Sequence, residues 1–355
     1  MNSDSNGSDS NGNVRPPQLV GEAGLQEQAP DASRVLVVVP ALNEDRSIGA
    51  CLASILSDEW SQDTQIVVID GGSTDQTREI VTRMIDNHPN LILADNPARL
   101  QSAGINAAVK QFAKAETQFI VRCDAHAIYP PRYVRRIVQS LIAHPNAAAV
   151  ATPMDAIGDS CFSRAAAWIV DTKLGSGGSA HRGGQTSQWV DHGHHAGFRA
   201  EWFEKIGGYD ESFSHNEDAE FDLRLGLAGG KIWLDADIRL DYQMRRSARA
   251  LARQYWNYGR GRARTVAKHR IKPRLRQMIP PINVVVLTAS FIAVLFVPAV
   301  LIIPVGYITL LVAVSLIGIV KLRLLCGLWS GVALGVIHNA WGLGFLYQSV
   351  QERRR

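Results

Sequence analysis

Cysteine is scarce in this chain of 355 residues, and its placement argues against two kinds of scaffold. The cysteines lie far apart and match no zinc-binding spacing. They also give no hint of a disulfide framework, which suits a protein of a reducing compartment. The four residues are Cys51, Cys123, Cys161 and Cys326.

Apolar residues are missing from the N-terminus. The first residues, MNSDSNGSDSNGN (1–13), contain no apolar core, so we expect no signal peptide there. Residues 1–33 as a whole are poor in apolar side chains, and such a segment cannot bury enough apolar surface to fold. We therefore predict a disordered tail over 1–33.

Charge is missing from a long stretch near the other end. No Asp, Glu, Lys or Arg occurs from Ile282 to Val320, and about 20 apolar residues cross a bilayer core. This stretch is therefore long enough for two transmembrane helices, with a break between Pro298 and Pro304. A further apolar run covers 324–350, so we predict a membrane region of two to three helices over 279–350 and a basic tail over 351–355.

The route of the third apolar run stays open. It is either re-entrant or interfacial, or it is a third span that carries the terminal arginines across the membrane. Gly327, Gly331 and Gly335 recur in it at four-residue intervals, a spacing that lets helices approach closely.

Acidic residues are missing from the segment 242–276. This basic segment holds 12 of the 37 Lys and Arg residues, so the rest of the chain carries more acidic than basic residues. Basic residues beside membrane spans mark the cytoplasmic side, which predicts an inner-membrane protein whose N-terminal part faces the cytoplasm.

The basic segment itself predicts contact with membrane lipids. Leu251, Tyr255 and Tyr258 recur at helical spacing, which favours an amphipathic helix at the membrane interface over 242–278. The alternatives are clamping of a diphosphate and binding of nucleic acid. The neighbouring spans favour lipid and argue against nucleic acid.

Residues 34–241 alternate between predicted strands and helices. Apolar runs at 35–39, 65–70, 91–93 and 119–122 are typical of strands buried on both faces, and stretches with helical spacing separate them. This alternation predicts an α/β domain with a mostly parallel sheet and helices on its faces.

Acidic residues follow three of these strands. Glu44, Asp70 and Asp124 each come shortly after a buried run, and ligands bind outside the carboxyl ends of such strands. A turn is the ordinary explanation for one such residue, but three would converge on one crevice. The loop GGSTDQT (71–77) lacks the G-x-G-x-x-G fingerprint, which argues against a Rossmann dehydrogenase.

Several stretches, in order, resemble family 2 glycosyltransferases with the GT-A fold. The variants DAH (124–126), NEDAE (216–220) and QYWNYGRGRART (254–265) are most similar to ExoA-type enzymes of succinoglycan and exopolysaccharide synthesis. The resemblance implies a Rossmann-like GT-A domain over 34–241, followed by C-terminal transmembrane helices. The other matching stretches are VVVPALNE (37–44), VVIDGGSTDQT (67–77), NPARLQSAGINAAV (96–109) and GGYDESFSHNEDAEFDLRLGLAGGKIWL (207–234).

The resemblance implies a site for a UDP-sugar donor. Asp70 would contact the uracil, and Pro40 and Glu44 would shape the same pocket. Asp124 lies at the position of the metal-binding D-x-D motif of the family. Gln254 and Arg260 loosely match the Q-x-x-R-W motif of related synthases and would close over the donor diphosphate.

A divalent cation suits this chemistry, because negative charge develops on the departing diphosphate. His126 stands where the family has its second Asp, and it alternates with Asp124 along an extended segment. Carboxylate oxygens bind both Mg²⁺ and Mn²⁺, and Mn²⁺ also accepts imidazole. We predict Mn²⁺ or Mg²⁺ with Asp124 and His126 as ligands, the alternative being that His126 is a structural neighbour.

The resemblance makes Glu217 and Asp218 the acidic pair of the active site, with Asp218 as the general base. The alternative is a solvated start of a helix, where the helix dipole favours acidic residues. Asp222, one turn further along, is expected to be structural. His195 is predicted to line the acceptor pocket. A separate metal site at His192 and His194 is not favoured, because no second group of ligands lies near them in the sequence.

Together these features predict a membrane-anchored, inverting glycosyltransferase. It would move a sugar, with UDP-glucose as the favoured donor and a β-linkage as the product, to a polyprenyl-diphosphate-linked saccharide in exopolysaccharide synthesis. The alternatives are a processive polysaccharide synthase and a catalytically silent membrane scaffold with the same fold.

Overall fold

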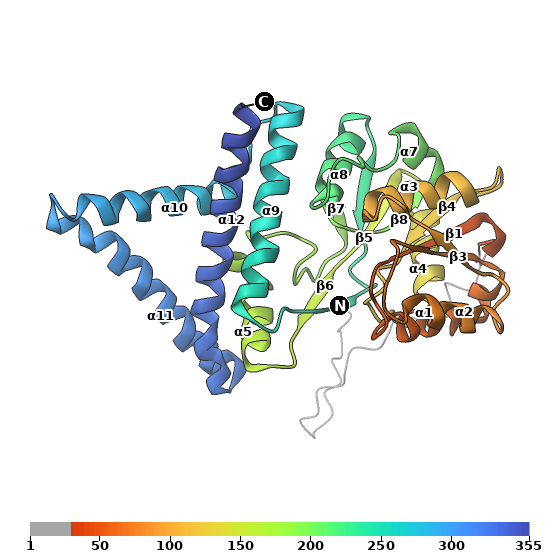
Figure 1. Cartoon of the computed structure of the whole chain (residues 1–355), viewed down its shortest axis with the longest axis horizontal. Helices are drawn as coiled ribbons and strands as arrows, with labels where there is room; N and C mark the ends of the chain where they lie inside the picture. The colour runs from red at the N-terminus through yellow and green to blue at the C-terminus, as the bar shows by residue number, and fades with distance from the viewer. Residues whose placement is uncertain (1–29, 355) are drawn as a thin grey trace, which may run out of the picture.

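The structure is a computed structural model that describes residues 30–354. A body of sheet and helices extends to about residue 243, and a set of long helices lies beside it (Figure 1). Of the tail predicted over 1–33, only residues 30–33 are described, and Ala32–Arg34 form a short 3-10 helix there.

An eight-stranded sheet forms the centre of the body, in the order β3-β2-β1-β4-β8-β5-β9-β7. β1 pairs in parallel with β2 and with β4, β2 pairs in parallel with β3, and β5 pairs in parallel with β9. Within residues 30–354, β7 and β8 alone run against their neighbours in this sheet, which confirms the mostly parallel prediction. The bounds are β1 (Val35–Ala41), β2 (Gln65–Asp70), β3 (Leu91–Asp95), β4 (Phe119–Arg122), β5 (Ala147–Thr152), β7 (Gln188–Val190), β8 (His194–Arg199) and β9 (Lys231–Leu234).

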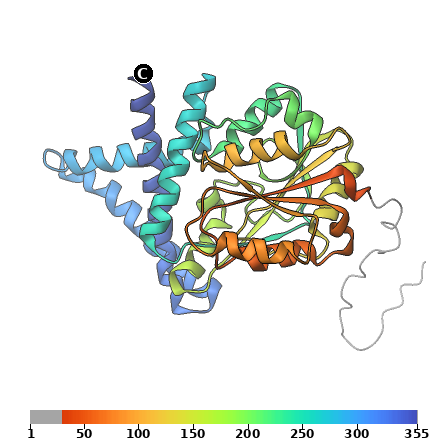
Figure 2. The same cartoon turned by 45° about the vertical axis from the view of Figure 1, so that its right-hand side comes forward.

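Both faces of this sheet are buried, which explains the continuous apolar runs of its strands. In β1, Val35, Val37 and Val39 join the core on one face, whereas Leu36 and Val38 join the core on the other. Helices cover both faces (Figure 2), as predicted. On the first face lie α1 (Ile48–Leu56), α2 (Thr77–Ile85) and α4 (Tyr133–Ala143), and on the second lie α3 (Gln101–Phe112), α7 (Ala200–Lys205) and α8 (Glu217–Leu227).

A smaller unit connects this body to the long helices. β6 (Met154–Ile157) and β10 (Leu240–Gln243) pair in parallel as a two-stranded sheet. The helices α5 (Cys161–Val170) and α6 (Lys173–Ser176) follow β6. α5 packs against the long helices through Phe162 and Ile169, so it fixes them to the body.

Four long helices complete the chain. α9 (Ala248–His269) and α12 (Trp329–Arg353) run side by side in the same direction (Figure 1). α10 (Leu275–Ala293) and α11 (Ile302–Leu322) extend away from this pair and converge at a tip, where Leu295 and Phe296 are 80% and 79% exposed.

Glycines set the distance between these helices. A Cβ atom at Gly259 would lie 2.1 Å from the carbonyl oxygen of Trp341, and one at Gly344 would lie 2.2 Å from that of Trp256. In the predicted glycine series, a Cβ at Gly331 would lie 2.1 Å from the carbonyl oxygen of Leu311 in α11. The glycines therefore allow the backbones of neighbouring helices to approach closely, as their spacing indicated.

Two helices within residues 30–354 are long and apolar enough to cross a membrane, Leu275–Ala293 and Pro298–Leu322. The break between them covers residues 294–297, which corrects the prediction of a break between Pro298 and Pro304; those two residues belong to the start of the second helix. The third apolar run forms most of α12 and buries Leu334 and Ile337 against the rest of the protein. In α9 the apolar residue Leu251 is likewise buried in this cluster, so protein rather than lipid covers that part of the helix.

One disulfide corrects the expectation drawn from the cysteine spacing. Cys161, the first residue of α5, is bonded to Cys326, which lies between α11 and α12. The two residues are 165 positions apart, so only the packing of α5 against the membrane region brings them together. Cys51 and Cys123 are free and buried.

Replacing Gly344 by Ala tests the packing of α9 on α12. The new methyl group would lie 2.2 Å from a backbone oxygen, so the helices would have to move apart. We expect a loss of about 1–3 kcal/mol in unfolding free energy, seen as a lower thermal midpoint of the detergent-solubilised protein. Gly306→Ala in α11 is the control, because nothing lies within 4 Å of that Cβ position. Equal losses in both variants would contradict the packing argument.

Candidate active site

Arg122, the last residue of β4, lies at the centre of the candidate site. Its side chain is only 4% exposed, and its Nη1 donates a hydrogen bond to Oδ1 of Asp218 at 2.5 Å. Its Nη2 lies 3.3 Å from Oδ1 of Asp124. One buried cation therefore joins the carboxylate that follows β4 to the carboxylate in the first turn of α8.

The charges of these three residues depend on one another. Burial raises the pKa of Asp124 and of Asp218, but the Arg122 guanidinium outweighs this effect and holds both pKa values well below the usual range. Burial lowers the pKa of Arg122, but the carboxylates of Asp218 and Asp124 outweigh burial and raise this pKa well above its usual value. All three groups are thus ionised at neutral pH.

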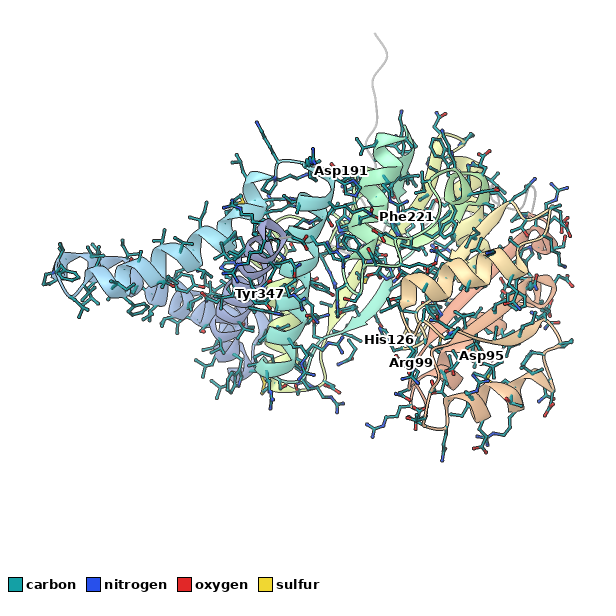
Figure 3. All side chains as sticks on the ribbon, turned by 45° about the horizontal axis from the view of Figure 1, so that its top comes forward. Asp95, Arg99, His126, Asp191, Phe221 and Tyr347 are labelled. Carbon is teal, nitrogen blue, oxygen red and sulfur yellow. A yellow bond between two sulfur atoms is a disulfide. The ribbon has the colours of Figure 1, made fainter. Side chains whose placement is uncertain are left out.

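Asp124 and His126, which the sequence paired, have different partners in this structure. The Asp124 carboxylate lies 3.1 Å from the side-chain nitrogen of Gln101 and 3.2 Å from Nε2 of His194. His126 is 58% exposed, and its Nδ1 lies 3.3 Å from Oε1 of Glu44. Figure 3 shows His126 at the edge of the body that faces the long helices.

The polar side chains that follow β1 and β4 fit a cation that is bound together with a phosphate group. No cluster of three or more potential ligands occurs within residues 30–354. Asp124, however, is ionised, and Glu44, which follows β1, pairs with His126, which follows β4. Mg²⁺ sites of nucleotide enzymes use one or two carboxylates and take their other ligands from phosphate and water. Asp124 and His126 as ligands of a divalent cation stay a prediction.

Asp70 ends β2 and organises the loop that follows it. Its carboxylate accepts hydrogen bonds from the backbone of Gly72 and Ser73 at 3.0 Å, and from Arg78 at 2.9 Å. Burial raises the pKa of Asp70, but these bonds outweigh it and lower the pKa. The carboxylate has no exposed surface in this structure, so a ligand would have to replace one of its partners.

The loops after β1 and β2 are bound to each other. The backbone nitrogen of Glu44 donates to the Thr77 hydroxyl at 2.7 Å, and Pro40 lies opposite Ile69 in the parallel pair β1–β2. Gly72 has a φ of +79°, and a Cβ there would lie 3.3 Å from a guanidinium nitrogen of Arg99. Arg99 thus lies over this loop and adds a positive charge beside it.

His195, which we expected to face the acceptor, is entirely buried in β8. Its Nε2 forms a short contact with Oδ1 of Asp222, and its Nδ1 lies 2.7 Å from the Tyr209 hydroxyl and 3.4 Å from Oδ1 of Asp218. Asp222 also contacts Nδ1 of His192 at 2.6 Å, so it is structural, as expected. His195 therefore contacts Asp218 from the protein interior.

Glu217 differs from Asp218 in its electrostatics. Burial and the neighbouring Asp218 carboxylate raise the pKa of Glu217 to about 7. The helix turn that the sequence identified thus holds one carboxylate that stays ionised and one that titrates near neutral pH.

Gln254 and Arg260 have hydrogen-bond partners in different parts of the structure. The Gln254 side-chain nitrogen contacts the hydroxyls of Tyr242 and Tyr258, at 2.5 and 3.0 Å. Arg260 donates to Gln348 of α12 at 3.1 Å. Contact of these two side chains with a donor diphosphate stays a prediction.

Sequence reasoning missed Arg122, Tyr209, Gln101 and Arg99. The one available signal was Arg122 itself, because a charged residue inside a strand buried on both faces needs a partner. The contacts of Tyr209 and Gln101 cross between elements far apart in the chain, so no local pattern indicated them.

The chain is similar to known glycosyltransferases. Residues 36–207 match the family described as Glycosyl transferase family 2. The succinoglycan biosynthesis protein ExoA of Rhizobium meliloti is 40% identical over 90% of this chain and 96% of its own length. A Methanococcus voltae dolichyl N-acetyl-alpha-D-glucosaminyl phosphate 3-beta-D-2,3-diacetamido-2,3-dideoxy-beta-D-glucuronosyltransferase is 24% identical over 66% of this chain and 74% of its own.

A solved structure shows the same fold. The mannosyltransferase PcManGT from Pyrobaculum calidifontis, in complex with GDP-Man and Mn²⁺, superposes with a TM-score of 0.59 at 20% identity, over 89% of this chain and 90% of its own. The chain therefore belongs to glycosyltransferase family 2, in its ExoA-type branch, with a GT-A fold.

The His195–Asp222 pair predicts a pH dependence of stability. Burial lowers the pKa of His195, but the carboxylates of Asp222 and Asp218 outweigh it and raise the pKa to about 9. Because the folded state holds this proton more tightly, the stabilisation is full below about pH 6.5 and is lost as pH rises through 9. We expect the thermal midpoint to fall over that range, and the fall to shrink in Asp222→Asn. An unchanged slope in that variant would contradict the pairing.

Proposed function

We propose that this protein transfers a sugar from a UDP-sugar, with UDP-glucose as the favoured donor, to a polyprenyl-diphosphate-linked saccharide in exopolysaccharide synthesis. The observation that carries the proposal is the cluster of Arg122, Asp124 and Asp218 at the carboxyl ends of the parallel strands. The ExoA relative supports a role in exopolysaccharide synthesis, and the Methanococcus voltae relative, whose name includes a dolichyl-linked sugar phosphate, supports a lipid-linked acceptor.

The donor would bind across the loops that follow β1, β2 and β4. Asp70 and its loop would meet the uracil, and Pro40 and Glu44 would complete that pocket. The diphosphate would extend toward Asp124, where Mn²⁺ or Mg²⁺ held by Asp124 and His126 would neutralise it. Arg99 supplies a further positive charge on this path.

Transfer would proceed by a single displacement with inversion. The acceptor oxygen forms a bond to the anomeric carbon, the bond from that carbon to the phosphate oxygen breaks, and UDP leaves with the bonding electrons. The proton of the acceptor hydroxyl passes to a carboxylate, which typically contributes 10²–10⁴-fold to the rate. An α-linked donor would give a β-linked product.

Asp218 is our proposed general base, and Glu217 is its neighbour of higher proton affinity. Asp218 has 22% of its side chain exposed and is held in place by Arg122 and His195. A base works best when its pKa lies near the working pH, and this consideration favours Glu217. The two residues must therefore be separated by experiment.

The acceptor would approach from the membrane side. The two candidate spans and the ExoA relative support membrane association, and the basic segment favours an orientation of the body toward the cytoplasm at the inner membrane. The acceptor would then come within reach of Asp218 from the side of the long helices.

UDP release from a panel of nucleotide sugars tests the function directly. Detergent-solubilised protein and a lipid extract would be assayed with Mn²⁺, Mg²⁺ or a chelator. We expect turnover of one donor, lost in the chelator. Long products from a single acceptor would instead indicate a processive synthase. Binding of UDP without turnover in any lipid extract would favour a silent scaffold.

Substitutions of the acidic pair identify the base. We expect Asp218→Asn to reduce kcat by about 10²-fold or more while UDP binding stays intact. Glu217→Gln should keep most of its activity if Asp218 is the base. If Glu217 is the base, Glu217→Gln should instead abolish turnover, and the loss of wild-type activity below pH 7 should report its protonation. Retained turnover in Asp218→Asn would overturn our assignment.

Asp70→Asn tests the contact with the base of the nucleotide. We expect UDP affinity to fall by about tenfold, the loss of a charge-assisted hydrogen bond, with less effect on GDP. Equal losses for UDP and GDP would mean that Asp70 only orders its loop.

A further inference from the structure

A pocket of about 110 Å³ lies between α9, α12 and the segment that leads into α8. It does not include Arg122, Asp124 or Asp218, although the QYWNYGRGRART stretch (254–265) supplies one of its walls. The α9 side is formed by Asn257, Arg260, Gly261 and Arg264, which share one helix face because they are three, four and seven residues apart.

Arg260 and Arg264, two arginines one helix turn apart, line this pocket. Like charges at this spacing repel each other, so the arrangement is unfavourable unless an anion lies between them. Within residues 30–354, neither of them forms an ion pair with a carboxylate. Lys268, on the same helix, pairs with both Asp210 and Glu220.

Each of the two arginines makes one side-chain hydrogen bond to the part of the chain that the structure describes. Arg260 donates through Nε to Gln348 at 3.1 Å, and Arg264 donates through Nη1 to the Ser212 carbonyl at 2.6 Å. A guanidinium carries five N–H donors, so each side chain keeps several for a ligand. Arg264 also lies 4.6 Å from the centre of the Phe213 ring, which holds it at the pocket wall.

The other polar groups of the pocket are mostly neutral. Nε2 of His215 lies 3.0 Å from the Asn257 side-chain nitrogen, and burial together with Arg260 lowers the pKa of His215. None of the described residues that line the pocket is acidic, and Glu352, outside the lining, accepts from the Gln348 side chain at 2.6 Å. Two cations and neutral polar groups in a pocket of this size suit a phosphate group, which arginine binds with two parallel hydrogen bonds.

The position of the pocket indicates where the phosphate comes from. α9 and α12 form its walls, and these helices carry the apolar α10–α11 hairpin (Figure 1). None of the loops after β1, β2 and β4, where the nucleotide would bind, lines it. On the other wall, His215 precedes Asp218 by three residues in the chain.

We propose that this pocket binds a phosphate group of the membrane-borne acceptor and so places the acceptor sugar near Asp218. This inference rests on the proposed function for the nature of the acceptor. The donor diphosphate, which Arg260 was expected to contact, offers the same phosphate chemistry, and the experiment separates the two sources.

Binding of farnesyl diphosphate, a short isoprenoid diphosphate, and of UDP to the full-length protein in phosphate-free detergent tests the proposal. We expect Arg260→Gln and Arg264→Gln each to weaken farnesyl diphosphate binding by about tenfold or more and to leave UDP binding unchanged. Lys272→Gln is the matched control, because it removes a charge from the basic segment outside the pocket. It should bind both ligands like the wild type. Arg264→Lys should lose less than Arg264→Gln, because it keeps the charge.

Three results would overturn the inference. One is wild-type affinity for farnesyl diphosphate in both arginine-to-glutamine variants, and another is a loss of UDP affinity instead, which would assign the pocket to the donor. The third is binding of farnesol as tight as that of farnesyl diphosphate, because the phosphate would then not be recognised. Release of UDP from a nucleotide sugar by the wild type is measured separately. If the wild type releases UDP but the arginine variants bind farnesyl diphosphate like the wild type, the result refutes the phosphate pocket alone. If the wild type releases no UDP from any donor, the result counts against the proposed function.

Discussion

The ion pairs of Arg122 hold the candidate site together. Its guanidinium is buried between Asp124 and Asp218, and removing one member of such a group typically costs 3–5 kcal/mol because a buried charge is left uncompensated. β4 supplies the cation and α8 supplies one of the anions. The carboxyl end of β4 and the start of α8 are therefore fixed relative to each other, which is what a reaction between two bound substrates requires.

A second layer of charge surrounds this group. Asp218 contacts His195, His195 contacts Asp222, and Asp222 contacts His192. Imidazoles thus alternate with carboxylates through the protein interior. Each carboxylate keeps its charge because a donor faces it. Glu217 is the member of the group whose pKa rises, because burial and the neighbouring Asp218 carboxylate outweigh the attraction of Arg122. The fold thus gives two adjacent carboxylates different proton affinities.

The membrane region is part of the same architecture. Gly259 and Gly344 let α9 and α12 pack at close range, α5 and its disulfide fix this pair to the body, and α9 brings Arg260 and Arg264 beside the segment that leads to Asp218. α9 and the helix that carries the acidic pair are therefore neighbours in space.

The sequence by itself determined the fold class, because apolar runs such as 35–39 and the helical spacings between them are local consequences of burial on both faces of a sheet. It also determined the two apolar helices and, through motif resemblance, the acidic positions Asp70, Asp124, Glu217 and Asp218. Only the tertiary structure decided which side chains meet. Asp218 meets Arg122, Asp124 meets His194, His126 meets Glu44 and Cys161 reaches Cys326, since each of these contacts joins elements that lie far apart in the chain. It also decided that α12 packs on α9, because hydropathy alone does not distinguish an apolar helix face that meets lipid from one that meets another helix.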